Sequence, residues 1–545
     1  MGTNGHKEYD GIIIGAGHNG MILQGYLLKA GLSVAVVERH LELGGGLDSH
    51  ERSRGGFWHN VHSLNHRAVP DLPWFRDLEL ASYGQEYVRP EVAVAMLFRD
   101  RTALIWHNHE VEKTLASIAR FSPRDAKTFA DFHRRFAPVV KSIIGPETYS
   151  PPMPAEEKRA LLEKSEIGRA YYEFADRSIN EVVKEVFEDD RVRSMISYLF
   201  LVRGNELDAP GQGYIVPVAC AGGINSTISR GTSHKLAHSL HQMVVKQGGE
   251  VFEGEAAVEI LFENGRASGV RLADGRIFKA RKFVVSTLNP HQTFLQLMDP
   301  DKIDPQLKKR AENFKYSPTT PLVTVHLALK ERPMYLAAEY EPDVMKGWLI
   351  IMGVEGMEDI QALHRDCYAG RVPSRRQLIG GVPTIFDSSQ APEGHHVAWF
   401  WQIAPYFLKE GPEHWDVILD EVCESVMELI HEFAPNINKD TIVYWFGHSP
   451  LDIERHLPNM KHGDWMCGEL SSDQFLDKRP FPECSRYRTP VEGLYLAGSS
   501  CHPGGNITGA PGYNAANIIT EDLDAERWWT PPDLEKIWSN LPASE

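Results

Sequence analysis

The chain has 545 residues, a formal net charge of -17 and 42% hydrophobic residues. An acidic excess of this size argues against nucleic acid as a partner, because binding to a phosphate backbone requires a basic surface. No run of about 18 apolar residues occurs, so no transmembrane helix is expected, and a chain of this length is expected to form two or three domains.

Cysteine usage and the start of the chain bear on its compartment. The first ten residues are polar and lack the apolar core of a signal peptide. The six cysteines are scattered and form no Cys-x-x-Cys pair. These features favour reduced thiols and a cytoplasmic location. No metal is predicted, since the histidines are not spaced with cysteines or carboxylates in the patterns of metal ligands.

The first predicted element is a strand over residues 11–14, which a glycine-rich turn joins to a helix. Gly15 allows the tight turn, Gly17 lets the backbone approach a pyrophosphate, and Gly20 lets the helix pack on the strand. The helix covers 21–29, and a second strand over 34–37 ends at Glu38. A carboxylate there can accept hydrogen bonds from both hydroxyl groups of a ribose. This order of elements predicts a dinucleotide-binding unit.

A second glycine-dense segment lies near the other end of the chain. Residues 493–498 predict a buried strand that enters a turn, and glycines recur from 504 to 512. A cofactor long enough to need both ends of the chain is more consistent with FAD than with NAD. No second fingerprint occurs, so a separate NAD(P)H domain is not expected. The turn 44–46 is predicted to pass close to the adenosine end of the cofactor, with a plain surface loop as the alternative.

The middle of the chain supplies a third part of the same domain. Leu236, Leu240 and Met243 share one face of a predicted helix. A strand over 250–253, a hairpin over 258–271 and a buried strand over 283–286 follow it. We therefore predict a discontinuous FAD-binding domain made of residues 1–75, 215–300 and 480–527.

The remaining segments predict the rest of the molecule. Residues 76–214 are expected to form a mostly helical cap, with one helix beginning at Ser122-Pro123. Residues 301–479 are expected to form a mixed-sheet substrate domain with strands over 322–329, 348–352, 397–403 and 442–446. The Trp-rich tail, 528–545, docks on a neighbour or on its own domain. The predicted fold class is α/β: a discontinuous Rossmann-like FAD-binding domain, an α+β substrate domain and a helical cap.

Aromatic residues are dense in the predicted substrate domain, for example at Trp399, Phe400 and Trp401. Core packing is the default explanation of such a cluster. The alternative is an aromatic cage around a planar or unsaturated substrate, in a closed apolar pocket over the flavin.

The C-terminal motif resembles that of the phytoene desaturase family, within the wider FAD-dependent amine-oxidase-like superfamily. It comprises residues 486–498, His502 to Gly505 and 509–516. Within the family it is similar to the carotenoid ketolase and isomerase branch and to the mitochondrial relatives of phytoene desaturase. The chain departs from the family pattern at three places: Gly46 stands where an Arg is usual, Asn506 replaces a Gly, and residues 59–62 replace a Phe-Asp-x-Gly sequence. These departures leave FAD binding as expected but put a carotenoid substrate in question.

The resemblance, taken with the fingerprint, implies a set of cofactor contacts from both ends and the middle of the chain. The residues predicted to bind FAD are Gly15, Ala16, Gly17, Asn19, Gly20, Glu38, Arg39, Gly45, Gly46, Val258, Gly498, Ser499, Gly505, Asn506 and Ile507.

The resemblance also places residues 59–63 along the flavin ring. Imidazole titrates near neutrality, so His62 is predicted to act as an acid-base or substrate-orienting group. A structural hydrogen bond is the alternative role. His59 and His66 share the segment and are further catalytic candidates.

Three functions are consistent with the sequence. The first is an FAD-dependent dehydrogenase, desaturase or oxidase that moves a hydride from an apolar, aromatic or polyene substrate to flavin N5. Its electron acceptor would be oxygen, a quinone or another protein. The second is a redox-neutral isomerase or saturase that uses reduced FAD. The third is a flavin-free escort-type protein that binds prenyl lipids. The Trp-rich tail also suggests a homodimer or a peripheral membrane contact.

Overall fold

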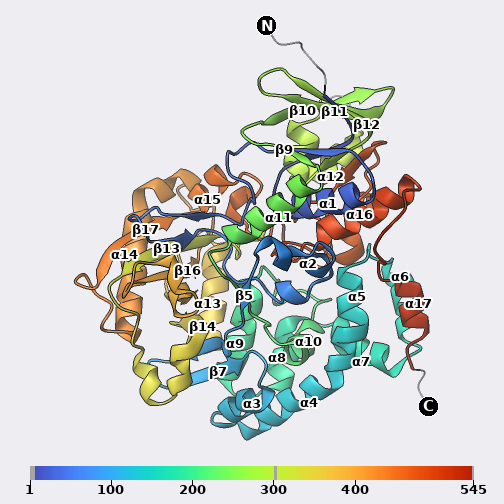
Figure 1. Ribbon diagram of the computed structural model, residues 1–545. Coiled ribbons are helices and arrows are strands. Elements are labelled where there is room, and N and C mark those ends of the chain that lie inside the picture. Colours follow the sequence, from blue (N-terminus) through green and yellow to red (C-terminus); the bar gives the residue numbers. More distant parts are fainter. Residues whose placement is uncertain (1–6, 300–302, 543–545) are drawn as a thin grey trace.

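The computed structural model describes residues 7–299 and 303–542 (Figure 1). Part of the polar start, the predicted boundary at 300/301 and the last residues of the tail lie outside this range. The described chain forms two seven-stranded sheets, two small two-stranded sheets and a group of helices. No helix within the described residues is both long and apolar enough to cross a bilayer.

The nucleotide-binding sheet draws its strands from the beginning, middle and end of the chain. Its order is β10-β11-β12-β1-β2-β9, with β18 paired to β12. The pairs β1–β2, β1–β12, β2–β9 and β12–β18 are all parallel. The strands are β1 (Lys7–Ile14), β2 (Val34–Val37), β9 (Glu250–Phe252), β10 (Ala257–Glu263), β11 (Arg266–Leu272), β12 (Ile277–Ser286) and β18 (Leu494–Leu496). The expected Rossmann-like, discontinuous sheet is confirmed.

Three helices pack together beside this sheet. Helix α1 (His18–Lys29) contacts both α11 (His234–Lys246) and α16 (Ala510–Asp522). The contact with α16 is close, because a Cβ atom added to Gly512 would lie 2.2 Å from the carbonyl oxygen of Asn19. The two ends of the chain therefore meet at the start of α1.

The second sheet is mixed and has the order β17-β13-β16-β15-β14-β6-β7. Its strands are β6 (Val92–Leu97), β7 (Ala103–His107), β13 (Leu322–Leu329), β14 (Gly347–Met352), β15 (Leu378–Gly381), β16 (His396–Ile403) and β17 (Ile442–His448). Strands β6 and β7 come from the segment predicted to be a mostly helical cap. Both are apolar and fully buried, and β6 pairs in parallel with β14. Sequence analysis missed these two strands, and the proposed domain boundaries stay a prediction.

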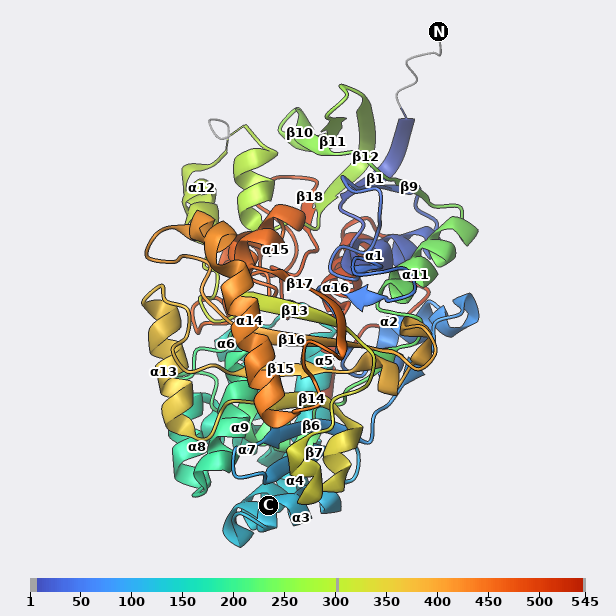
Figure 2. The same cartoon turned by 90° about the vertical axis from the view of Figure 1, so that its left-hand side faces the viewer.

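Helices cover both faces of the mixed sheet. In Figure 2, α14 (Trp415–Phe433) crosses one face of the stacked strands. The group below and behind the other face comes mainly from residues 111–222. Its helices are α3 (Val111–Ala119), α4 (Pro123–Val139), α5 (Gly145–Thr148), α6 (Ala155–Leu162), α7 (Glu166–Ala175), α8 (Ile179–Val186), α9 (Asp190–Leu201) and α10 (Ile215–Gly222). Helix α4 begins as expected, with the Ser122 side chain accepting a hydrogen bond from the Asp125 N–H.

The remaining elements are short. The two small sheets pair β3 (Ser49–His50) with β4 (His59–Asn60) and β5 (Tyr87–Val88) with β8 (Ile228–Ser229). The other helices are α2 (Pro73–Asp77), α12 (Pro305–Glu312), α13 (Met357–Tyr368), α15 (Pro450–His456) and α17 (Leu534–Ser539).

The C-terminal tail packs on its own chain. The Trp528 indole donates a hydrogen bond to the Tyr26 carbonyl, and the Trp529 indole donates to the Asn517 side chain. Trp538 is fully buried and donates to the Ser142 carbonyl. Contact of the tail with a neighbouring molecule stays a prediction.

Candidate active site

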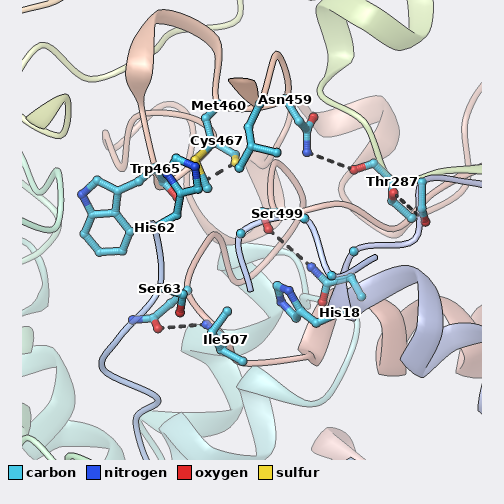
Figure 3. Close-up of a pocket in the computed structure, with 18 of the residues that line it drawn as sticks. His18, His62, Ser63, Thr287, Asn459, Met460, Trp465, Cys467, Ser499 and Ile507 are labelled. Carbon is cyan, nitrogen blue, oxygen red and sulfur yellow. Dashed lines mark hydrogen bonds between the residues drawn. The ribbon is translucent and has the colours of Figure 1, made fainter. Parts of the chain in front are cut away.

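A large cavity of about 500 Å³ lies between the nucleotide-binding sheet, the mixed sheet and the helices. This volume lies within the range typical of pockets for small molecules and cofactors. Figure 3 shows Trp465 and His62 on one side, His18 and Thr287 on the other, and Ser499 between them in this view. These residues come from segments far apart in the sequence, so only the folded chain creates the cavity.

Glycines form the nucleotide end of the cavity. Gly17 lines it with ordinary extended backbone, and a Cβ atom added there would meet nothing within 4 Å. At Gly20, by contrast, a Cβ atom would lie 2.2 Å from the Gly15 carbonyl oxygen. Gly17 therefore leaves open space beside the start of α1, whereas Gly20 permits close packing of helix on strand.

The Glu38 carboxylate fixes the end of β2 at the cavity wall. Its Oε2 atom accepts a hydrogen bond of 2.8 Å from the Ala16 N–H, and Oε1 accepts one of 3.0 Å from the His40 N–H. The carboxylate is buried but lines the cavity. This places an acceptor where the fingerprint predicts contact with a ribose.

The C-terminal turn closes the same end. The Asn19 amide, at the start of α1, donates a hydrogen bond of 3.4 Å to the Ser499 hydroxyl. Behind the turn lies Arg479, which is fully buried. Its guanidinium donates to the backbone carbonyls of Ser499, Cys501 and other residues of the loop. Arg479 thereby holds the turn against the opening glycines.

Most of the predicted cofactor residues lie in the cavity wall. These are Gly15, Gly17, Asn19, Gly20, Glu38, Arg39, Gly45, Gly46, Val258, Ser499, Asn506 and Ile507.

Three of the predicted residues lie behind the wall. Ala16 offers its N–H to Glu38. A Cβ atom at Gly498 would lie 2.2 Å from the Thr287 carbonyl oxygen, and one at Gly505 would lie 2.7 Å from the Met466 backbone. At both positions, close packing between two chain segments leaves no room for a side chain.

His62 is the predicted catalytic residue that the structure brings to the cavity. Its Nε2 atom is buried and has no hydrogen-bond partner among the described residues. Burial lowers the pKa of His62 to about 3, against the opposing effect of the Asp48 carboxylate. The imidazole is therefore neutral at physiological pH. The unpartnered Nε2 atom argues against the alternative role of a structural hydrogen bond.

Behind His62 lies a network centred on Asp48. The Asp48 carboxylate accepts hydrogen bonds of 2.9 Å from His456 Nε2 and 2.7 Å from His50 Nε2. The rings of His62 and His456 are stacked, with centroids 5.4 Å apart. Despite its burial, the pKa of Asp48 is held below its usual range by these histidines. A buried carboxylate anion thus lies next to the His62 imidazole.

His59 and His66 do not line the cavity, contrary to their candidacy as catalytic residues. His59 is buried and its Nε2 atom lies 2.8 Å from the Ser53 hydroxyl. His66 is fully buried and its Nδ1 atom lies 2.9 Å from the Tyr87 hydroxyl. Burial lowers the pKa of His59 to about 4 and that of His66 to about 3. The hydrogen-bond partners Ser53 and Tyr87 do not line the cavity either, which supports a structural role for both histidines, although the Nε2 atom of His66 has no partner among the described residues.

Comparison with known proteins decides the family. The model of flavin-containing amine oxidoreductases matches residues 25–519. The chain belongs to this family. It is an oxidoreductase with FAD as its cofactor, as expected from the two glycine segments.

Relatives cover the whole chain. It is 30% identical over 542 residues to a subunit of the limonene dehydrogenase of Castellaniella defragrans, covering 97% of each. It is 24% identical to a chloroplastic prolycopene isomerase of Daucus carota, covering 97% of this chain and 82% of the relative. A neurosporene-forming phytoene desaturase of Cereibacter sphaeroides is 23% identical and covers 62% of each chain. The resemblance to the phytoene desaturase family is confirmed.

A solved structure supports the fold. An oxidoreductase from Methanosarcina mazei is similar with a TM-score of 0.59 at 17% identity, covering 94% of this chain and 99% of that one. At this level of identity the similarity concerns the fold alone.

The cavity of this family member fits FAD on its own geometry. The open space at Gly17 and the acceptor at Glu38 suit the adenosine diphosphate half. The same cavity is lined by Ser499, Asn506 and Ile507 and also by apolar side chains of the mixed sheet, and the part that these side chains line is called the apolar chamber below. One long ligand can therefore reach from the fingerprint to that chamber.

The apolar chamber uses one face of the mixed sheet. Trp399 and Trp401 of β16 point to the cavity side, whereas Phe400 between them packs under α14. Leu349 of β14 and Ile379 of β15 lie on the same side as the tryptophans. The aromatic cluster thus divides by strand periodicity: one face is core and the other is a wall of the cavity. Core packing is confirmed for Phe400, whereas an aromatic cage around a substrate stays a prediction for Trp399 and Trp401.

Sequence analysis missed several polar residues of the wall. Arg203 follows α9 and has no motif around it that indicates a site. Asn459 and Trp465 lie in the loop after α15, where no periodic pattern exists. Only the folded chain identifies them.

Two groups of side chains have donor atoms close enough to hold a metal ion, although the sequence predicted none. One is Asp48, His62 and His456, and the other is Glu42, Asp48 and His50. Asp48 is shared by both, and its two oxygens already accept hydrogen bonds from His456 and His50. These bonds account for the cluster as an ion-pair network.

Proposed function

We propose that this chain is an FAD-dependent dehydrogenase that removes a hydride from an apolar or aromatic organic substrate. The observation that carries the proposal is the continuous cavity that joins the glycine-lined nucleotide end to the tryptophan-lined chamber. The relationship to a limonene dehydrogenase subunit over 97% of both chains supports oxidation of an apolar compound.

When bound, FAD supplies the hydride acceptor. The protein's part is to hold the substrate and to exclude water. Trp399, Trp401, Leu349 and Ile379 present an apolar surface against which a ring or alkyl chain packs. A substrate that covers this apolar surface displaces water from it.

His62 takes the proton that must leave when a carbon–carbon double bond forms. Its imidazole is neutral at physiological pH, so a lone pair is available for a proton or for a hydrogen bond that orients the substrate. The pKa of about 3, which already includes the effect of Asp48, makes it a weak base. The cation that results lies near the Asp48 carboxylate, which lowers its energy. His456 and His50, which bond to Asp48, are positioning residues for this carboxylate.

A redox-neutral isomerase is the second candidate, supported by the relationship to prolycopene isomerase over 97% of this chain. It uses the same cavity but consumes no electron acceptor. The dehydrogenase also needs an electron acceptor that reoxidises its flavin. Because the limonene dehydrogenase relative is one subunit of its enzyme, another protein is favoured over oxygen or a quinone.

One experiment separates these functions. The purified yellow protein is mixed with a panel of monoterpenes and alkylbenzenes, with and without prior photoreduction of the flavin. A dehydrogenase bleaches its oxidised flavin and returns an oxidised product. An isomerase needs the reduced flavin and releases product without consuming an acceptor. A protein that retains no flavin contradicts both, and leaves the escort-type alternative.

A further inference from the structure

Two arginines line the substrate chamber without an acidic partner. Arg67 donates hydrogen bonds of 2.8 Å and 3.1 Å to the carbonyls of Ile224 and Gly223. The side chain of Arg203 makes no hydrogen bond and no salt bridge within residues 7–299 and 303–542. The guanidinium group of Arg67 is near enough to disfavour the charge on Arg203.

A buried guanidinium normally has its charge solvated by the protein. Arg479 is the example in this chain, since it is fully buried and donates to several backbone carbonyls. Arg203 is partly exposed to the cavity that it lines and has no such set of acceptors among the described residues. Burial, followed by repulsion from Arg67, lowers the pKa of Arg203 well below its usual range, and burial lowers that of Arg67 to about 10. Arginine still stays protonated at neutral pH, so two positive charges face the chamber.

The wall of the cavity holds no anion that neutralises them. Glu38 is the one acidic residue among the wall residues described, and it lies at the nucleotide end. Its carboxylate already accepts hydrogen bonds from Ala16 and His40.

The tryptophans add further donors to the chamber. The indole N–H groups of Trp399, Trp401 and Trp465 have no acceptor among the described residues. Trp399 is only 2% exposed, so its donor is desolvated in the absence of a ligand. The chamber is therefore rich in donors and poor in acceptors. An uncompensated charge of this kind costs several kcal/mol unless a ligand supplies the opposite charge.

We propose that the substrate is an anion: an apolar or aromatic carboxylate whose head group binds Arg203 and Arg67 while its hydrocarbon body packs on Trp399 and Trp401. The proposal rests on the function proposed above and specifies its substrate class. Guanidinium forks match the two oxygens of a carboxylate. Arg203 lies beside Leu199, Phe200 and Val202, all of which line the cavity, so the charged group sits at the edge of an apolar surface. A neutral hydrocarbon would leave both arginines without an anion.

The same charge chemistry has a second source, the pyrophosphate of FAD. The position of the fingerprint favours the substrate, because Gly17 and the start of α1 already offer the pyrophosphate site. The flavin content of an Arg203→Met variant distinguishes the two sources. A substrate site leaves that content unchanged, and a pyrophosphate site lowers it.

The test is equilibrium binding to the oxidised holoenzyme, measured by calorimetry and by the shift of the flavin spectrum. The probes are 4-isopropylbenzoate and its neutral amide, which have nearly the same shape. We expect the carboxylate to bind at least about tenfold more tightly, as charge-assisted hydrogen bonds require. Arg203→Met removes this preference, Arg203→Lys retains part of it, and Arg169→Met, an exposed arginine on α7, leaves it unchanged.

The proposal is overturned if the amide binds as tightly as the carboxylate, if neither binds, or if Arg203→Met keeps the preference. If Arg203→Met does not fold, the test is made with Arg203→Lys and with the two probes on the unaltered protein. Bleaching of the flavin by neutral hydrocarbons, without preference for carboxylates, removes the inference and keeps the proposed function. A preference for the carboxylate without any flavin reduction keeps the inference that the site binds an anion and removes the proposed dehydrogenase function.

Discussion

The two ends of the cavity are built in different ways. At the nucleotide end the chain presents backbone, with open space at Gly17 and a turn held by the buried Arg479. At the substrate end it presents large side chains, among them Trp399, Trp401 and Arg203. Backbone geometry depends on a few glycines at fixed spacing, whereas a side-chain wall varies freely within a fold. The first end therefore identifies the family, and the second determines the substrate.

The sharpest way to break this comparison is to add a side chain at Gly17. A Cβ atom at Gly17 meets no protein atom within 4 Å, so Gly17→Val adds its side chain on the open side of the turn beside α1. We expect a folded protein that retains almost no flavin after gel filtration and has lost its activity. Circular dichroism and the flavin-to-protein absorbance ratio measure both effects. Gly55→Val is the control, because Gly55 is exposed and a Cβ atom there also meets nothing within 4 Å. A yellow Gly17→Val protein contradicts the assignment of the nucleotide end.

Substitution of His62, the proposed proton acceptor, tests the part of the cavity that lies between the nucleotide end and the substrate end. We expect His62→Gln to slow anaerobic flavin reduction by about 10²–10⁴-fold, the usual contribution of a general base, while flavin content stays constant. The pKa of His62 near 3 keeps the base neutral, so the rate in the unaltered enzyme should hold as the pH falls from 8 to 5. His59→Gln, outside the cavity wall, serves as the comparison. Equal rates for His62→Gln and the unaltered enzyme rule out the role.

At the substrate end, Trp401→Ala removes part of the apolar wall. If the indole contributes about 2–3 kcal/mol to the binding free energy by burying apolar surface, its removal weakens binding of an apolar substrate by about 30–150-fold. Flavin content should not change. The matched control is Trp445→Ala on β17, since Trp445 packs on the opposite side of the mixed sheet, against the α14 core. Equal losses of affinity in both variants show that the effect is on stability rather than on the chamber.

A further prediction concerns stability against pH rather than the cavity itself. His59 and His66 are buried and uncharged, with pKa values of about 4 and 3. An unfolded histidine has a pKa of about 6.5, so below this pH the unfolded state takes up protons that the native state does not. Above pH 6.5 both states leave these histidines uncharged, so the free energy of unfolding is not reduced by their titration. It should fall by up to about 1.4 kcal/mol per pH unit for each histidine as the pH drops toward 4. Urea unfolding of the double variant His59→Asn, His66→Asn should show a flatter pH profile, and an unchanged profile contradicts the assignment.

The sequence predicted most of the nucleotide end, because its signals are local. Strand β2 occurs at its expected bounds. In the mixed sheet, β13 and β16 also occur within one residue of theirs. The helix of the fingerprint begins three residues earlier than expected, at His18. Gly498 and Gly505 were assigned to the cofactor from the motif, yet packing against Thr287 and Met466 explains them. A glycine pattern alone does not separate these two requirements.

The substrate end was predicted in part. Alternation along β16 was visible in the sequence, but the side that faces a cavity depends on α14 and on the helices opposite. Strands β6 and β7 were missed because a continuous apolar run in a helical context does not reveal a strand that inserts at a sheet edge. Arg203 was missed because its significance is the lack of a partner, which exists only in the folded chain.

The most direct test of the central claim is the isotope dependence of flavin reduction. The oxidised holoenzyme is mixed anaerobically with its apolar substrate and with the same compound deuterated at the carbon that loses hydrogen, and the visible flavin absorbance is followed in time. Loss of the flavin colour that slows several-fold on deuteration is the result expected if one cavity holds both FAD and the reacting C–H bond. A protein whose flavin stays oxidised with every apolar, aromatic and carboxylate compound tried contradicts the account.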